Sequence, residues 1–92
     1  MSSTGPTRRV LIPSALQSYT GASLVAAQGD TLGDVLDDLD RRYPGLRFRV
    51  VDEQDQLRRH MRVFVEGQAV RALAEALPTG AQVNLVLALS GG

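Results

Sequence analysis

An amphipathic helix with strand-like segments on both sides is the feature that most restricts the fold of this chain. Its apolar residues recur at the spacing i, i+3, i+4, i+7 and i+11: Leu32, Val35, Leu36, Leu39 and Tyr43. This spacing places them on one face of a helix of about three to four turns. Asp30 or Thr31 can cap the start of the helix, and Pro44-Gly45 ends it. Such a helix needs an apolar surface to cover.

Short apolar or alternating segments before and after the helix predict the strands of a sheet. The first strand ends at Pro13, which cannot donate to a ladder, and forms a hairpin with the second. A tight turn at Glu66-Gly67 joins two later strands. The predicted strands are residues 8–13, 22–26, 61–66, 68–70 and 83–90.

The remaining segments are predicted as connections. Residues 14–21 form a connection that ends in a Thr20-Gly21 turn, and residues 52–56 form a polar turn. Residues 46–51 favour a short strand or an irregular segment against the core. Residues 72–77 favour a short helical turn, followed by a turn at residues 78–80.

The order of these elements, a hairpin, a helix and then two or three strands, indicates an α+β fold of the β-grasp (ubiquitin-like) type. We expect a mixed sheet of four to five strands with one main helix packed across it. The last strand should lie in the middle of the sheet, beside the first. Ninety-two residues suit one domain. Residues 1–7 are expected to be a flexible leader, residues 8–89 the domain, and residues 90–92 an exposed tail.

Composition excludes several classes of function. The formal net charge is zero, so no electrostatic case for nucleic-acid binding arises. The sequence has no apolar run near the length of a membrane span and no signal-peptide core, so we expect a cytoplasmic protein with no membrane partner. It has no cysteine, and all ten basic side chains are arginine. Another copy of this chain therefore offers no thiol and no lysine.

Two charged clusters have alternative interpretations. Asp34, Asp37, Asp38 and Asp40 lie off the apolar stripe and lack histidine partners or calcium-loop spacing, so we interpret them as a solvated face and expect no metal site. A second cluster is basic: Arg58, Arg59, His60 and Arg62. It is either a solvated edge or a docking patch for an acidic partner. His60 has no acid or nucleophile implied beside it.

The final residues, Gly91-Gly92, follow the last predicted strand directly. Glycine has no Cβ, so a diglycine enters a narrow channel freely and leaves the terminal carboxylate unhindered. The alternative is a frayed end without function, which is common at termini. The functional interpretation is a tail of Ser90, Gly91 and Gly92 that enters the active site of a partner enzyme.

At this point the chain resembles the ThiS/MoaD family of bacterial sulfur carriers over about residues 9–92. The resemblance rests on the order and spacing of residues 29–36, residues 63–67 and the terminal Ser90-Gly91-Gly92. Residues 31–33 and 41–45 look most like the CysO-type branch, which serves cysteine synthesis. Glu66-Gly67 stands where the family often has Asn-Gly, and Thr79-Gly80-Ala81 where it often has Asp-Gly-Asp. Both turns keep their glycine.

The resemblance implies a carrier protein, not an enzyme, whose chemistry is performed on Gly92. An E1-like enzyme using ATP and magnesium would adenylate the Gly92 carboxylate, and a sulfur donor would displace AMP to leave a thiocarboxylate. The chain itself would bind no cofactor. For a CysO-type carrier the family implies a PLP-dependent cysteine synthase as sulfur acceptor and a zinc peptidase that releases the product.

Two alternatives to the cysteine pathway remain at this stage. A MoaD-like chain would be the small subunit of molybdopterin synthase, with its tail inserted in the large subunit. A ubiquitin-like modifier would instead be conjugated to lysines of other proteins. In each case the sheet could dock the partner, and the candidate docking residues are Phe64, Leu85, Leu87, Arg58 and Arg59, although the three apolar ones could equally belong to the core.

Overall fold

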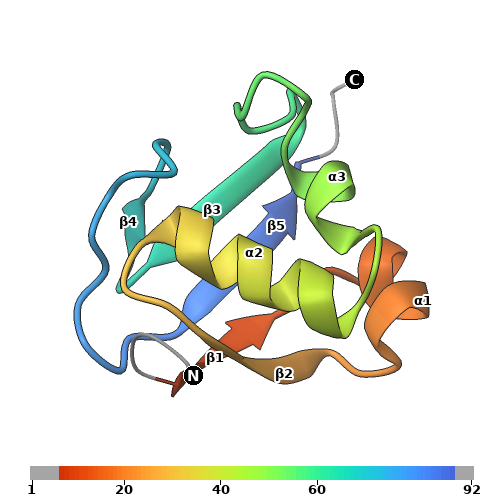
Figure 1. Ribbon diagram of the computed structural model, residues 1–92, viewed down its shortest axis with the longest axis horizontal. Helices are drawn as coiled ribbons and strands as arrows, with labels where there is room; N and C mark the ends of the chain where they lie inside the picture. The colour runs from red at the N-terminus through yellow and green to blue at the C-terminus, as the bar shows by residue number, and fades with distance from the viewer. Residues whose placement is uncertain (1–6, 89–92) are drawn as a thin grey trace.

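The computed structural model of the protein describes residues 7–88, which form one five-stranded sheet with helices packed against it (Figure 1). Two short helical segments, η1 and α1, follow the first strand, and two further helices, α2 and α3, follow the second. The strands are β1 (Thr7–Leu11), β2 (Leu24–Gln28), β3 (Met61–Val65), β4 (Gln68–Ala69) and β5 (Val83–Leu87). The helices are η1 (Ser14–Leu16), α1 (Gln17–Thr20), α2 (Leu32–Arg42) and α3 (Leu46–Val50).

The strand order is β2-β1-β5-β3-β4, which confirms the β-grasp prediction. β1 and β2 form the expected antiparallel hairpin, with Leu11 opposite Leu24. β5 lies in the middle of the sheet, parallel to β1 and antiparallel to β3. The sheet is therefore mixed: β1 accompanies only the start of β5, whereas β3 pairs with β5 as far as Leu87.

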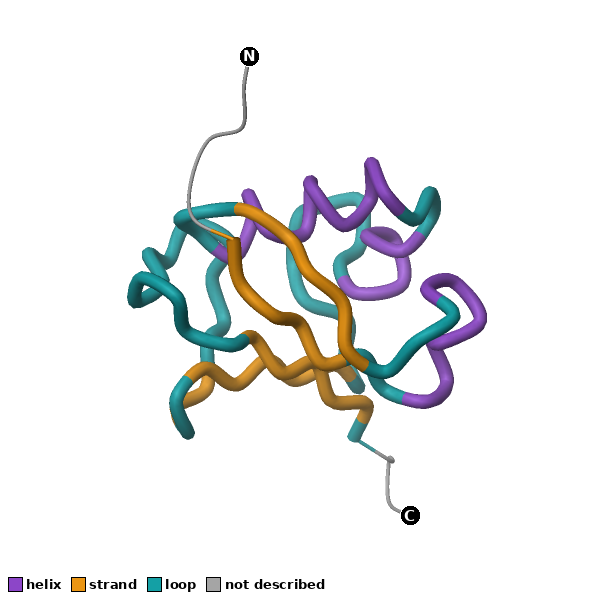
Figure 2. Tube along the Cα trace, turned by 90° about the horizontal axis from the view of Figure 1, so that it is seen from below, coloured by secondary structure: helices purple, strands orange, loops and turns teal. Residues whose placement is uncertain are grey.

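The main helix α2 covers one side of the sheet (Figure 2). The Thr31 hydroxyl accepts a hydrogen bond from Asp34 N at 3.1 Å, so Thr31 is the N-cap, one of the two predicted candidates. Four of the five stripe residues, Leu32, Val35, Leu36 and Leu39, are each 0% exposed, and Tyr43, at the C-cap of α2, is partly buried against the core. These residues pack against inward-facing strand residues such as Val10, Val63 and Leu85 to form the core. No helix within residues 7–88 is long and apolar enough to cross a membrane.

Three of the predicted connections were wrong in their local structure. Residues 14–20 form the short helices η1 and α1 in place of a simple connection. Residues 46–50 form helix α3 and no strand. The reason is that Leu46 and Val50, four residues apart, are buried while Phe48 between them is 55% exposed, which is a helical and not an alternating pattern.

Residues 72–77 do not form the predicted helical turn, because the segment 30–33 takes up their backbone groups. Gly33 N donates to Leu73 O at 2.8 Å, Leu32 N donates to Glu75 O at 3.3 Å, and Leu77 N donates to Asp30 O at 2.8 Å. An isolated bridge also joins Thr31 to Ala76. The segment is therefore extended along the start of α2, with one turn near Leu73.

Candidate functional site

The end of β5 is the point from which the candidate tail departs. In the antiparallel ladder Leu87 lies opposite Met61, and Ala88 N then donates to His60 O at 2.7 Å. The backbone is thus held by the sheet as far as residue 88. Ser90, Gly91 and Gly92, the predicted tail, lie outside the described residues. The sheet therefore fixes the backbone up to the residue from which the predicted tail continues.

Two buried polar side chains stiffen the other end of the sheet. Arg8 is only 2% exposed, so its charged side chain lies in the interior of the fold. Its Nη2 donates to Gly29 O at 2.9 Å, and its Nη1 donates to Pro78 O and Ala81 O, both at 2.9 Å. A single guanidinium therefore ties β1 to the turn before α2 and to the turn before β5.

Asp38 is the second of these side chains, and its place corrects a prediction. Only 5% of it is exposed, so it does not belong to a solvated acidic face. Burial alone would raise the pKa of the Asp38 carboxyl, but the hydrogen bonds from Gln28 N, Arg42 and Arg41 outweigh burial and hold that pKa below its ordinary value. Each of these bonds is 2.9 Å long. Asp38 thereby fastens α2 to β2.

The sheet face opposite α2 carries exposed apolar side chains. Leu11, Leu24 and Val86 are 38%, 42% and 38% exposed. Leu11 lies opposite Leu24 on one side and opposite Asn84 on the other, and Val86 follows two residues after Asn84 on the same face of β5. Grouped apolar residues on a surface are typical of protein-binding sites. We refer to Leu11, Leu24 and Val86 as the open-face patch.

The predicted docking residues separate into different environments. Leu85 is 1% exposed and belongs to the core, so it cannot contribute to a surface. Leu87 is partly buried against the core. Phe64 is half-buried and lies opposite Asn84, beside the open-face patch.

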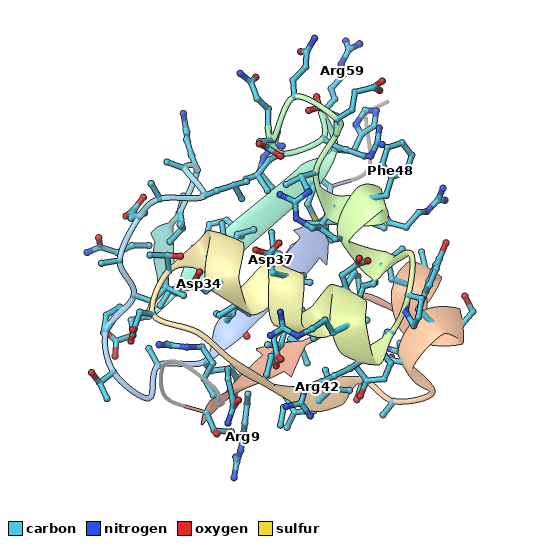
Figure 3. All side chains as sticks on the ribbon, viewed as in Figure 1. Arg9, Asp34, Asp37, Arg42, Phe48 and Arg59 are labelled. Carbon is cyan, nitrogen blue, oxygen red and sulfur yellow. The ribbon has the colours of Figure 1, made fainter. Side chains whose placement is uncertain are left out.

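Arg58 and Arg59 lie away from the open-face patch, in the loop before β3. Arg58 Nε donates to Phe48 O at 2.6 Å, and its guanidinium carbon lies 4.3 Å from the centroid of the Phe48 ring. Arg59 is labelled near the loop tip in Figure 3. The carbonyl of the next residue, His60, accepts from Ala88 N and so holds the end of β5. Both arginines therefore lie within two residues of this contact.

Sequence reasoning missed the open-face patch, although a signal was present. In β3 the residues Met61, Val63 and Val65 are buried while Arg62 between them is exposed. The alternation along the whole of β3 assigns Arg62 to the solvent face and its apolar neighbours to the opposite face. The same argument applied to Asn84 in β5 would have assigned Val86 outward and Leu85 inward.

Within residues 7–88 no group of three or more histidine, aspartate or glutamate side chains is placed to hold a metal ion.

Comparisons with known proteins decide the family. The ThiS family model matches residues 10–92. The chain belongs to the ThiS family. This assignment confirms the resemblance drawn from the sequence.

The chain is also similar to individual sulfur carriers. It is 37% identical over 89 residues to the sulfur carrier protein CysO of Mycobacterium tuberculosis, covering 90% of this chain and 96% of the relative. The crystal structure of that organism's CysO superposes with a TM-score of 0.83 at 34% identity, covering 89% of this chain and 99% of the other. A chain from the crystal structure of the Amycolatopsis orientalis BexX/CysO complex gives a TM-score of 0.84 at 30% identity, covering 92% and 99%.

A second kind of relative belongs to archaea. The small archaeal modifier protein 1 of Haloferax volcanii is 39% identical over 69 residues, covering 74% of this chain and 78% of the relative. The crystal structure of this protein superposes with a TM-score of 0.76 at 31% identity, covering 94% of this chain and 99% of the other. The chain is therefore similar both to a sulfur carrier and to a protein modifier.

Proposed function

We propose that this protein is a sulfur carrier and not an enzyme, and that Gly92 is the residue on which the sulfur is carried. An E1-like enzyme would join the Gly92 carboxylate to AMP with release of pyrophosphate from ATP. A sulfur donor would then displace AMP and leave a thiocarboxylate at Gly92. The observation that carries this proposal is the 37% identity to CysO along nearly the whole relative.

The geometry supports a passive role for the folded domain. β5 pairs with β1 at Val83 and Asn84 and with β3 along its whole length, and Ala88 N donates to His60 O, so the domain presents the residues after Ala88 from a fixed point. A rigid origin and a narrow diglycine end suit insertion into a channel of another protein. ATP and magnesium belong to the activating enzyme in this account.

For the acceptor we propose an enzyme of cysteine synthesis, because CysO-type carriers serve that pathway. The PLP-dependent cysteine synthase would use the thiocarboxylate, and a zinc peptidase would release the cysteine formed. We propose that the open-face patch contributes apolar contact area when partner enzymes dock. Apolar residues surrounded by polar ones are typical of such interfaces.

The proposal is tested by intact mass. The protein is incubated with the E1-like enzyme of its own organism, ATP and a sulfide source. Replacement of one terminal oxygen by sulfur adds about 16 mass units, a covalent change that a Gly92-deleted control cannot show at the same site. No gain of mass with an enzyme shown to be active on ATP and this chain would contradict the proposal.

The similarity to a small archaeal modifier favours one second candidate, conjugation to lysines of other proteins. The same adenylate would then be attacked by a lysine amine in place of a sulfur donor. Tryptic digestion of cellular proteins would leave residues 72–92 attached to the modified lysines, because Arg71 is the last basic residue of this chain. The chain has no lysine of its own among its ten basic residues, so remnants on this protein itself are not expected.

A further inference from the structure

A hollow of about 900 Å³ lies beside β3, between the loop that precedes β3 and the segment that follows β4. Its arginines are Arg58, Arg59, Arg62 and Arg71. Apolar side chains, among them Leu57 and Leu73, line much of the rest. We refer to the hollow with these four arginines as the arginine groove.

Within residues 7–88 no arginine of the groove pairs with a carboxylate. Every ion pair with an arginine in this part of the chain uses Arg41, Arg42 or Arg47. Asp55 also lines the hollow, but its carboxylate lies 3.1 Å from Arg47 Nη2. Four like charges that line one hollow repel one another, and an anionic partner relieves that repulsion.

Two of the four guanidinium groups are held in place before any partner binds. Arg58 is fixed by its bond to Phe48 O and by the Phe48 ring. Arg62 Nη1 donates to Arg59 O at 2.9 Å and to Met61 O at 3.1 Å. Backbone carbonyls hold these groups without neutralising them, so further N–H donors are left for a ligand. Side chains fixed in advance lose less conformational entropy on binding.

The arginine groove adjoins the end of β5. Arg59 precedes His60, whose carbonyl holds Ala88, and Met61 lies opposite Leu87. In Figure 3 Arg59 is labelled at one end of the molecule and Arg9 at the other. An enzyme that takes up residues 90–92 must therefore approach the end at which Arg59 lies.

We propose that the arginine groove binds an acidic segment of the E1-like enzyme, at the entrance through which that enzyme takes up the tail. The guanidinium fork matches a carboxylate with two parallel hydrogen bonds, and the apolar lining suits the aliphatic parts of a peptide. This inference rests on the proposed function. It adds the chemistry of the partner surface and the place at which that surface docks.

The test compares two double variants with equal changes of charge. Arg59→Glu/Arg71→Glu reverses two groove charges, whereas Arg9→Glu/Arg49→Glu reverses two exposed charges that do not line the hollow. Pyrophosphate exchange by the E1-like enzyme of the same organism gives KM and kcat for each carrier. We expect the groove variant to raise KM roughly tenfold at low salt with kcat unchanged, because like charges now face each other. The difference should shrink at high salt.

An unchanged KM, or an equal rise in the Arg9→Glu/Arg49→Glu control, would overturn the inference. Arg59→Gln/Arg71→Gln provides a second variant that removes charge without reversing it, and a smaller rise in KM is expected. Thermal melts establish that each variant is folded. A wild-type protein that gains no sulfur mass would overturn the proposed function and this inference together. Normal sulfur loading with an unaltered KM would overturn the groove alone.

Discussion

Asp38 is a buried carboxylate that links helix α2 to strand β2. Its carboxylate accepts from Gln28 N of β2 and from Arg41 and Arg42 of α2. Asp38→Asn would keep an acceptor but place an uncharged amide against two arginines. We expect a loss of about 1–3 kcal/mol in the free energy of unfolding near neutral pH, measured by urea denaturation.

The pH dependence of stability gives a second measurement at Asp38. Because the folded-state pKa is lowered, the stabilisation from Asp38 is fully present above the unfolded-state pKa of about 3.9. It is lost as pH falls through the folded-state pKa. The wild type should therefore lose more stability than Asp38→Asn on acidification below about pH 4. Parallel curves for the two proteins would contradict this account.

Substitution of Arg8 by lysine keeps the positive charge but removes the forked arrangement of hydrogen-bond donors. Its guanidinium reaches three carbonyl oxygens, those of Gly29, Pro78 and Ala81. A lysine at position 8 has one ammonium group and cannot span these acceptors, so Arg8→Lys should cost about 2 kcal/mol in the free energy of unfolding. Chemical denaturation of the two proteins at neutral pH measures the difference. A cost near zero would show that the guanidinium's several N–H donors are not required to satisfy these carbonyl groups.

The sequence does not show that the side chains of Asp38 and Arg8 are buried. Asp38 is one of four aspartates off the apolar stripe, and the pattern does not distinguish the one that faces β2 from those that face solvent. Arg8 opens a predicted strand beside Arg9, and only the strand register shows that one points into the fold and the other out of it. Buried polar residues depend on distant backbone groups, which periodicity does not contain.

At the scale of elements, the turn between β3 and β4 contains one residue, Glu66, that adopts its backbone conformation at a cost. Glu66 and Gly67 have φ values of 52° and 80°, the left-handed pair that a two-residue hairpin turn requires. Gly67 adopts this conformation freely, but Glu66 does so at a cost. Glu66→Asn should raise the free energy of unfolding by about 0.5–1 kcal/mol, because asparagine tolerates positive φ. Thermal melts of both proteins, with Glu66→Ala as the control that should not gain, check this.

The strands and the main helix were predictable because their patterns are long and local. The stripe of α2 and the alternation of β3 each repeat enough times to exclude another period. α3 is five residues long, so too few residues repeat for the sequence to distinguish a helix from the predicted short strand or irregular segment. Residues 72–77 were wrongly predicted since their backbone partners lie in residues 30–33, far away in sequence.

At the scale of the whole molecule, the open-face patch should affect binding and not folding. Leu24→Asp/Val86→Asp removes apolar contact area from the sheet face and adds two charges there. We expect roughly tenfold weaker binding to the E1-like enzyme of the same organism, measured by titration calorimetry. Tyr19→Asp is the control, since Tyr19 is a 37% exposed apolar side chain on α1 outside the patch. Equal losses for both variants would contradict a specific docking face.

The order of elements was sufficient to predict the β-grasp topology, including the central position of β5. The site was predictable only in part. The chemistry was read from Ser90, Gly91 and Gly92, which lie outside the described residues. The surrounding surfaces could not be predicted from the sequence. The residues of the open-face patch come from three strands, β1, β2 and β5, and only the register of the sheet brings them together.

The most direct test of sulfur carriage is to locate the sulfur atom in the chain. The protein is loaded by the E1-like enzyme with ATP and sulfide enriched in the heavy isotope sulfur-34, and the intact ion is fragmented in the mass spectrometer. We predict a gain of about 18 mass units, confined to fragments that contain Gly92. A gain elsewhere in the chain, or none with an active enzyme, would contradict the claim that Gly92 carries the sulfur.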